Sequence, residues 1–107
     1  MGHVRVSAPE GLDRSVSRVG LPWGGLGLFV NVGYQQKLLE AGCDVFIAGE
    51  ACSYGFRFSA ECSVPMIETT HEGSENPGLR HFCDILRERF PDLNVEFFEV
   101  PPPWRWL

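Results

Sequence analysis

The sequence has no long apolar run and no excess of positive charge. It contains no stretch of the ~18 consecutive apolar residues that a membrane helix needs, and no segment joins a basic start, an apolar middle and a small-residue cleavage site. We therefore expect a cytoplasmic protein that does not contact membranes. The formal net charge is −5, whereas nucleic-acid affinity depends on Lys and Arg side chains that neutralise phosphates. We therefore expect no nucleic-acid partner.

The sequence also lacks closely spaced cysteines. Cys43, Cys52, Cys62 and Cys83 stand far apart without a C-x-x-C pair, which argues against a zinc ribbon and a thioredoxin-like motif. We expect these thiols to stay reduced. Cys52 lies in a loop-like stretch and is the candidate reactive thiol, but redox chemistry ranks last among the functions considered because no second cysteine is near it in sequence.

The chain has too little apolar sequence for a second domain. Its 107 residues are 44% hydrophobic, which suits one modest core. We therefore expect a single α/β domain over residues 1–107, with residues 1–14 as a loosely attached N-terminal segment and residues 101–107 as a Pro/Trp tail. Trp104 and Trp106 of the tail either fold back on the domain or contact another subunit.

Apolar periodicity predicts an alternation of strands and helices. Helices are expected at Val32–Ala41, Tyr54–Glu61 and Ser74–Phe90, with Ser74 as the N-cap of the last one. Strands are expected at His3–Val6, Val45–Ala48, Val64–Thr69 and Val95–Val100, and a tight turn at Pro22–Gly25 separates the apolar stretches Val16–Leu21 and Leu26–Val30. This alternation favours a three-layer α/β sandwich built on a mostly parallel sheet.

Two loops that follow predicted strands carry the reactive side chains. They are Gly49–Tyr54 and Thr69–Glu75, and in a parallel sheet ligands bind where strands end and helices begin. His71 and Glu75 are four residues apart with Gly73 between them, so both side chains could converge on one point. An imidazole beside a carboxylate suits Zn, Mn or Fe. A hydrogen-bonded structural pair is the alternative interpretation.

Other residues of these loops are candidates for supporting roles. Glu50 has three interpretations: it orients His71, acts as a general base, or accepts backbone donors at the start of a helix. Cys52, Ser53 and Thr70 lie in the same two loops and are candidate substrate-binding residues.

Two motifs of the chain resemble a known family. The stretch AGCDVFIAGE (Ala41–Glu50) is similar to the pattern A-G-x-D-x-x-I-T-G-E/D, and THEGSENPGL (Thr70–Leu79) is similar to G-H-x-x-x-E-x-x-G-[LIV]. Both patterns, with matching spacing between them, are typical of the NIF-three-like (Ngg-one-interacting factor three) proteins, often described as GTP cyclohydrolase 1 type 2 homologues. VEFFEVPPP (Val95–Pro103) resembles the closing strand of that family. The resemblance covers the C-terminal half of the family fold.

This resemblance implies a partial metal site. His71 and Glu75 match the metal ligands that the C-terminal half of the family supplies. The remaining ligands, a His-His pair and an Asp, come from an N-terminal half that has no counterpart in these residues. The chain also departs from the family locally, because Cys52–Tyr54 replaces a Ser-His-His stretch, Thr70 replaces a Gly and Ala48 replaces a Thr.

Two functions are implied by the resemblance. The first is a metal-dependent hydrolase, similar to GTP cyclohydrolase type 2, that uses a divalent Zn, Mn or Fe site, dinuclear when complete, on a phosphorylated or heterocyclic substrate. Another chain would then complete the site, with Glu50 as the candidate general base. The alternative is a non-catalytic oligomeric binding module with a vestigial metal site. The family tends to form ring-like homo-oligomers, so we expect a homo-oligomer, and a separate chain that supplies the N-terminal half is a further candidate partner.

Overall fold

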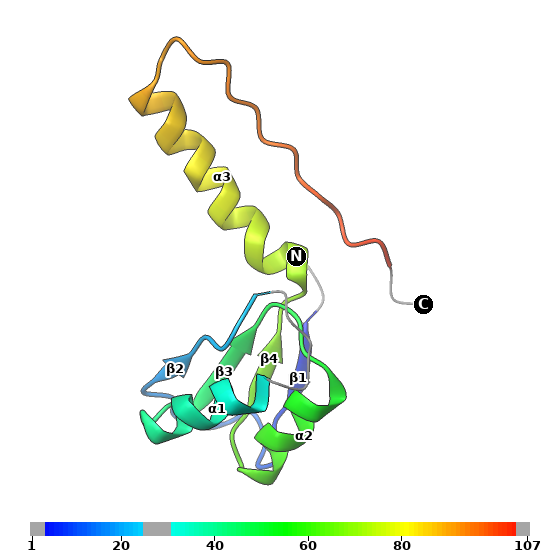
Figure 1. Cartoon of the computed structure of the whole chain (residues 1–107). Helices are drawn as coiled ribbons and strands as arrows, with labels where there is room; N and C mark the ends of the chain where they lie inside the picture. The colour runs from blue at the N-terminus through cyan, green and yellow to red at the C-terminus, as the bar shows by residue number, and fades with distance from the viewer. Residues whose placement is uncertain (1–3, 25–30, 105–107) are drawn as a thin grey trace.

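The structure is a computed structural model that describes residues 4–24 and 31–104. The described residues form four strands and three helices (Figure 1). In chain order these are β1 (Arg5–Ser7), β2 (Val19–Gly20), α1 (Asn31–Glu40), β3 (Val45–Ala48), α2 (Ser53–Glu61), β4 (Met66–Glu68) and α3 (His71–Arg89). The order therefore opens with two strands and closes with a helix, which differs from the strict alternation predicted.

The four strands form one mixed sheet in the order β1-β4-β3-β2. Strands β2, β3 and β4 run parallel, whereas β1 lies antiparallel to β4, with Arg5 opposite Glu68 and Ser7 opposite Met66. The prediction of a mostly parallel sheet was therefore wrong. The prediction depended on helices alternating with strands, but no helix lies between β1 and β2, and β1 pairs with β4, which is distant in sequence.

The core lies on one face of this sheet. Phe46 and Met66 are fully buried there, and Leu38 and Leu39 of α1 and Phe56 of α2 pack against the buried cluster that contains them. Figure 1 shows α1 and α2 together beside the sheet, whereas α3 leads away from it. No residue described in α3 is buried. The predicted three-layer sandwich is therefore not confirmed.

Helix α3 begins one turn earlier than predicted. Its N-cap is Thr70, whose Oγ1 accepts a hydrogen bond from the backbone N of Gly73 at 3.0 Å. The Ser74 hydroxyl instead donates to the carbonyl oxygen of His71 at 2.7 Å, a bond back along the helix that Ser commonly makes inside a helix. The prediction of Ser74 as the cap was wrong, and His71 is the first residue of the helix rather than part of a loop.

The predicted strand Val95–Val100 is also wrong. This segment runs back beside α3 (Figure 1) and pairs with no strand among the described residues. Asn76 Nδ2 donates to the carbonyl oxygen of Val100 at 2.9 Å, and Arg87 Nε donates to that of Val95 at 3.0 Å. Side chains of the helix therefore hold an extended segment that the alternating pattern had assigned to a sheet.

The remaining elements agree more closely with the predictions. Strand β3 and helices α1 and α2 match within one residue, and β4 is shorter than the predicted Val64–Thr69. His3 and Leu26–Val30 lie outside the described residues. The single-domain division with a loose N-terminal segment stays a prediction. Within residues 4–24 and 31–104, no helix has the length and apolar character that crossing a membrane requires.

Candidate functional site

The two predicted loops meet where β3 and β4 end. The Thr69 backbone N donates to the Ala48 carbonyl oxygen at 2.9 Å, and the Gly49 N donates to that of Trp23 at 3.1 Å. A Cβ on Gly49 would collide with the Gly24 carbonyl oxygen and with Ser74 Oγ. Glycine at position 49 therefore allows β3, the Trp23–Gly24 backbone and the first turn of α3 to approach one another.

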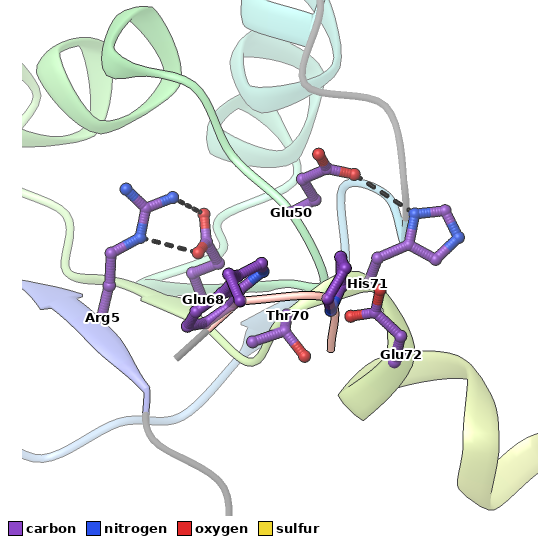
Figure 2. A pocket seen from close by; sticks show the side chains of 8 residues that line it. Arg5, Glu50, Glu68, Thr70, His71 and Glu72 are labelled. Atoms are coloured by element: carbon purple, nitrogen blue, oxygen red, sulfur yellow. Dashed lines mark hydrogen bonds and ion pairs between the residues drawn. The ribbon is translucent and has the colours of Figure 1, made fainter. Parts of the chain in front are cut away.

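His71 lies between two carboxylates. Its Nδ1 is 3.2 Å from Glu50 Oε2, and its Nε2 is 3.0 Å from Glu75 Oε1. Figure 2 shows the contact between Glu50, in the turn after β3, and the ring of His71 at the start of α3. Glu75 comes close because residues four apart share one face of a helix. The convergence predicted from spacing is present, and the helix rather than a turn at Gly73 produces it.

This arrangement favours a positive charge at the imidazole. The hydrogen bond with Glu50, followed by the charge of Glu75, raises the pKa of His71 above 6.5. A neutral ring carries only one N–H, so one ring nitrogen would present its lone pair to a carboxylate about 3 Å away. A proton or another cation at that position removes this repulsion. The two carboxylates therefore stabilise the protonated form of the His71 ring.

A cavity of about 490 Å³ opens beside Glu50 and His71. Its lining, drawn in Figure 2, comes from the sheet, the start of α3 and the C-terminal segment, and consists of Arg5, Glu50, Glu68, Thr70, His71, Glu72, Pro103 and Trp104. A smaller cavity of about 240 Å³ lies on the Glu75 side of the ring and also includes His71 and Glu72. His71 therefore faces two openings.

One of the three predicted substrate-binding residues lines this cavity, and the other two do not. Thr70 lines it and also caps α3. Cys52 and Ser53 are not among the lining residues. Cys52 occupies the N-cap position of α2 without a side-chain capping bond, and Ser53 is the first residue of that helix. Their roles stay predictions.

Sequence analysis missed Arg5 and Glu68. Glu68 ends β4 and is 5% exposed, and its carboxylate accepts hydrogen bonds from Arg5 and from the Ala51 backbone N. An acid inside the otherwise apolar stretch before Thr69 was the available signal, because a buried carboxylate requires a partner. The partner is distant in sequence, so the pairing itself was not predictable.

The donor atoms fit a divalent metal in type but not in number. Separations of about 3.0 Å, such as that between His71 Nε2 and Glu75 Oε1, occur between adjacent ligands of an octahedral ion with bonds of about 2.1 Å. Catalytic zinc sites use about three protein ligands. Within the described parts of the chain, however, no three His, Cys, Asp or Glu side chains form a metal-binding group. A complete site would need donors from elsewhere.

Comparison with models of protein families shows which family the chain belongs to. The family model described as Duf34/NIF3 (NGG1p interacting factor 3) matches residues 1–103. The chain belongs to the Duf34/NIF3 family. The resemblance carried by the two sequence motifs is thereby confirmed. A comparison with curated proteins gave no match.

Solved structures support this assignment at the level of the fold. A structure of protein SA1388 from Staphylococcus aureus has a TM-score of 0.70 and 18% identity, covering 98% of this chain and 33% of that one. A second SA1388 structure gives a TM-score of 0.67 at 16% identity, covering 98% and 29%. Reduced HcgD from Methanocaldococcus jannaschii gives a TM-score of 0.63 at 20% identity, covering 88% and 35%. The chain therefore spans about a third of these Duf34/NIF3-like structures.

Proposed function

We propose that this Duf34/NIF3 chain contributes His71 and Glu75 as two ligands of a divalent metal site of the Zn, Mn or Fe type. The observation that carries the proposal is the pair of acceptor atoms, one imidazole nitrogen and one carboxylate oxygen, that face each other at 3.0 Å. The mixed nitrogen and oxygen donors suit these borderline ions. A metal bound at Nε2 would displace the proton that the raised pKa of His71 favours there, because a ligating imidazole nitrogen is unprotonated.

Glu50 has a supporting role in this proposal. By accepting a hydrogen bond from His71 Nδ1, Glu50 Oε2 at 3.2 Å fixes the ring orientation and leaves Nε2 to the metal. A half-exposed carboxylate at the cavity wall is also suited to take a proton from water during hydrolysis. A bound divalent ion, or a pair of ions, would lower the pKa of that water and polarise the substrate.

The proposed reaction is hydrolysis of a phosphorylated or heterocyclic substrate in the cavity beside His71. Thr70 would contact the substrate directly because it lines the cavity. Cys52 and Ser53, at the start of α2, do not line this cavity, and their contact with a substrate stays a prediction. We propose that another chain, either a second copy or a separate polypeptide, supplies the missing ligands, because two donors are too few for a metal site.

Metal titration tests the ligand assignment. We expect wild-type protein to bind Zn²⁺ or Mn²⁺ in calorimetric titration, and the double variant His71→Ala, Glu75→Ala to lose this binding. The matched control, His81→Ala with Glu88→Ala, removes the same residue types from exposed positions of the same helix and should bind like wild type. Equal binding by both double variants would exclude His71 and Glu75 as ligands.

Removal of the metal by a chelator tests whether the proposed hydrolysis depends on a metal. Hydrolysis of phosphomonoester or purine nucleotide probes should stop when a chelator is added and when Glu50 is changed to Gln. Hydrolysis by the wild type that survives both chelation and His71→Ala would contradict a metal-dependent reaction at this site.

A second candidate function is a non-catalytic oligomeric binding module. Helix α3 favours this candidate, because none of its described residues is buried although it carries a row of apolar side chains. Leu79, Phe82 and Phe90 of this stripe are each about half exposed, which is typical of a helix that packs against another subunit. Metal-free wild-type protein with a native mass above that of one chain would favour this candidate over the hydrolase.

A further inference from the structure

The turn that carries Glu50 is held by an ion pair from outside the turn, formed by the buried carboxylate of Glu68 and the half-exposed guanidinium of Arg5. Glu68 Oε1 accepts a hydrogen bond from Arg5 Nε at 2.7 Å, and Glu68 Oε2 accepts one from the Ala51 backbone N at 2.7 Å. Arg5 Nη2 donates both to Glu68 Oε2 and to the Ala51 carbonyl oxygen, the latter at 3.0 Å. The pair therefore binds both polar groups of one residue, Ala51, directly after Glu50.

Strand pairing explains why these two charges meet. Arg5 and Glu68 are directly opposite each other in the antiparallel pair of β1 and β4, so their side chains share a face of the sheet. The Arg5 guanidinium also lies 5.2 Å from the centre of the Phe56 ring in α2. Its planar fork, with its pKa raised by the Glu68 hydrogen bond, can satisfy carboxylate and carbonyl oxygens together.

The backbone of the turn is fixed on its other side as well. The Gly49 N donates to the Trp23 carbonyl oxygen, and Trp23 Nε1 donates to the carbonyl oxygen of Glu50. The Glu50 side chain is half exposed, and its carboxylate contacts His71. The backbone is held on both sides of residue 50, which fixes where the Glu50 side chain leaves the turn. This side chain lines the cavity and contacts His71.

Stability of a sheet edge does not require an ion pair in which one carboxylate is buried, as Glu68 is. Apolar residues of similar volume often give equal or greater stability than a buried ion pair. They cannot, however, hold the N–H and C=O groups of a turn in one direction. The Arg5–Glu68 pair provides these directional hydrogen bonds to the N–H and C=O groups of Ala51.

We infer that Arg5 and Glu68 are positioning residues for the candidate site: they hold the Ala51 peptide groups and so aim Glu50 at His71. Among the described residues, the hydrogen bonds of Arg5 and Glu68 go to each other and to Ala51, and not to His71 or Glu75, so both act through the Glu50 turn. This inference deepens the proposed function, but the holding of the turn does not depend on a metal.

Arg5→Lys is the variant that separates positioning from folding. Lysine keeps a positive charge opposite the buried carboxylate of Glu68, so the protein should fold, but one ammonium group cannot reproduce the fork that also reaches Ala51. The matched control is Arg80→Lys. Arg80 likewise pairs with a carboxylate, Glu99, at 2.7 Å and lies 4.9 Å from the centre of an aromatic ring, Phe97, yet it is not among the residues lining the larger cavity.

The first measurement is local and needs no metal. We expect Arg5→Lys to raise the amide hydrogen-exchange rate of Ala51 at least about tenfold, because a charge-assisted bond network is lost there. Alkylation of Cys52 should accelerate with it, whereas Arg80→Lys should change neither rate. An unchanged Ala51 rate, or an equal increase at all amides, would overturn the inference.

The second measurement is a double-mutant cycle on Zn²⁺ affinity. Arg5→Lys should weaken binding roughly tenfold or more, as loss of an outer partner of a metal site commonly does, and should add little further loss in a Glu50→Gln protein. Equal losses in both backgrounds would show that Arg5 does not act through Glu50 and would overturn the inference. If wild-type protein binds no zinc, the proposed function fails, and the Ala51 exchange rates still decide the positioning role.

Discussion

At the scale of single residues, the imidazole ring of His71 contacts two carboxylates at once. Glu50 and Glu75 lie on opposite ring nitrogens, and together they raise the pKa of the imidazole. Because the pKa of His71 is raised above 6.5 in the folded protein, its contribution to stability is fully present below pH about 6.5 and is lost as the pH rises through the raised pKa.

This charge arrangement gives a prediction for metal-free protein. Glu50→Gln should lower the pKa of His71 toward 6.5, because the hydrogen bond with Glu50 is the largest cause of the shift. Titration of the His71 ring protons by NMR measures it, and Glu88→Gln, on the exposed last turns of α3, is the control. A pKa of His71 that is the same in Glu50→Gln and wild type would contradict the role given to Glu50.

Thr70 gives a second residue-scale prediction. Its φ of 78° is strained for a residue with a Cβ, at roughly 1–3 kcal/mol, whereas its hydroxyl caps α3. Thr70→Ala keeps the strain and loses the cap, so it should destabilise the protein by about 1 kcal/mol. Thr70→Gly also loses the cap but relieves the strain, so its stability should exceed that of the Ala variant. Denaturant unfolding of the two variants compares them, and the reverse order would contradict this account.

At the scale of elements, the end of β3 controls how the sheet meets α3. Gly49→Ala would place a methyl group against the Gly24 carbonyl oxygen and Ser74 Oγ, and we expect a loss of about 1–3 kcal/mol in the free energy of unfolding. Gly33→Ala in α1 is the matched control, because a Cβ there meets nothing within 4 Å. It should stabilise the helix by roughly 0.5–1 kcal/mol. Thermal or denaturant unfolding of both variants tests this contrast.

Local patterns predicted the elements well and their assembly less well. The apolar run Val45–Ala48 and the helical periodicity of α1 and α2 depend on neighbours in sequence, and these elements are confirmed. The direction of β1, the path of Val95–Val100 and the start of α3 depend on distant contacts or on one unusual dihedral angle. For the same reason, the His71–Glu75 convergence was visible in a spacing of four residues, whereas the Arg5–Glu68 pair was not.

At the scale of the whole molecule, α3 extends away from the sheet, and the C-terminal segment runs back beside it (Figure 1). The radius of gyration is 16.3 Å, compared with about 13 Å for a compact domain of this length. Apolar side chains of α3 and of its C-cap remain exposed, among them Leu79, Phe82, Ile85 and the C-cap residue Phe90. Such a stripe is more typical of a contact with another chain than of a free surface.

This shape gives a prediction about assembly. The native mass should exceed the 12.0 kDa of one chain, and Phe82→Glu should shift the protein toward single chains because a charge in a packed interface is costly. Light scattering after size exclusion measures both proteins, with Glu88→Gln as a surface control on the same helix. Removal of residues 101–107 tests the tail separately, and a folded oligomer of unchanged size would exclude the tail from the contact.

The proposed role of His71 and Glu75 is to hold a divalent metal. The most direct test is elemental mass spectrometry of untagged wild-type protein and of the His71→Ala, Glu75→Ala double variant, with the native mass recorded in the same preparations. We expect the wild type to contain about one or more metal ions for each site and the double variant to contain none. The native mass then indicates whether chains share the site. Wild-type protein without metal, or a double variant that retains it, would contradict the account.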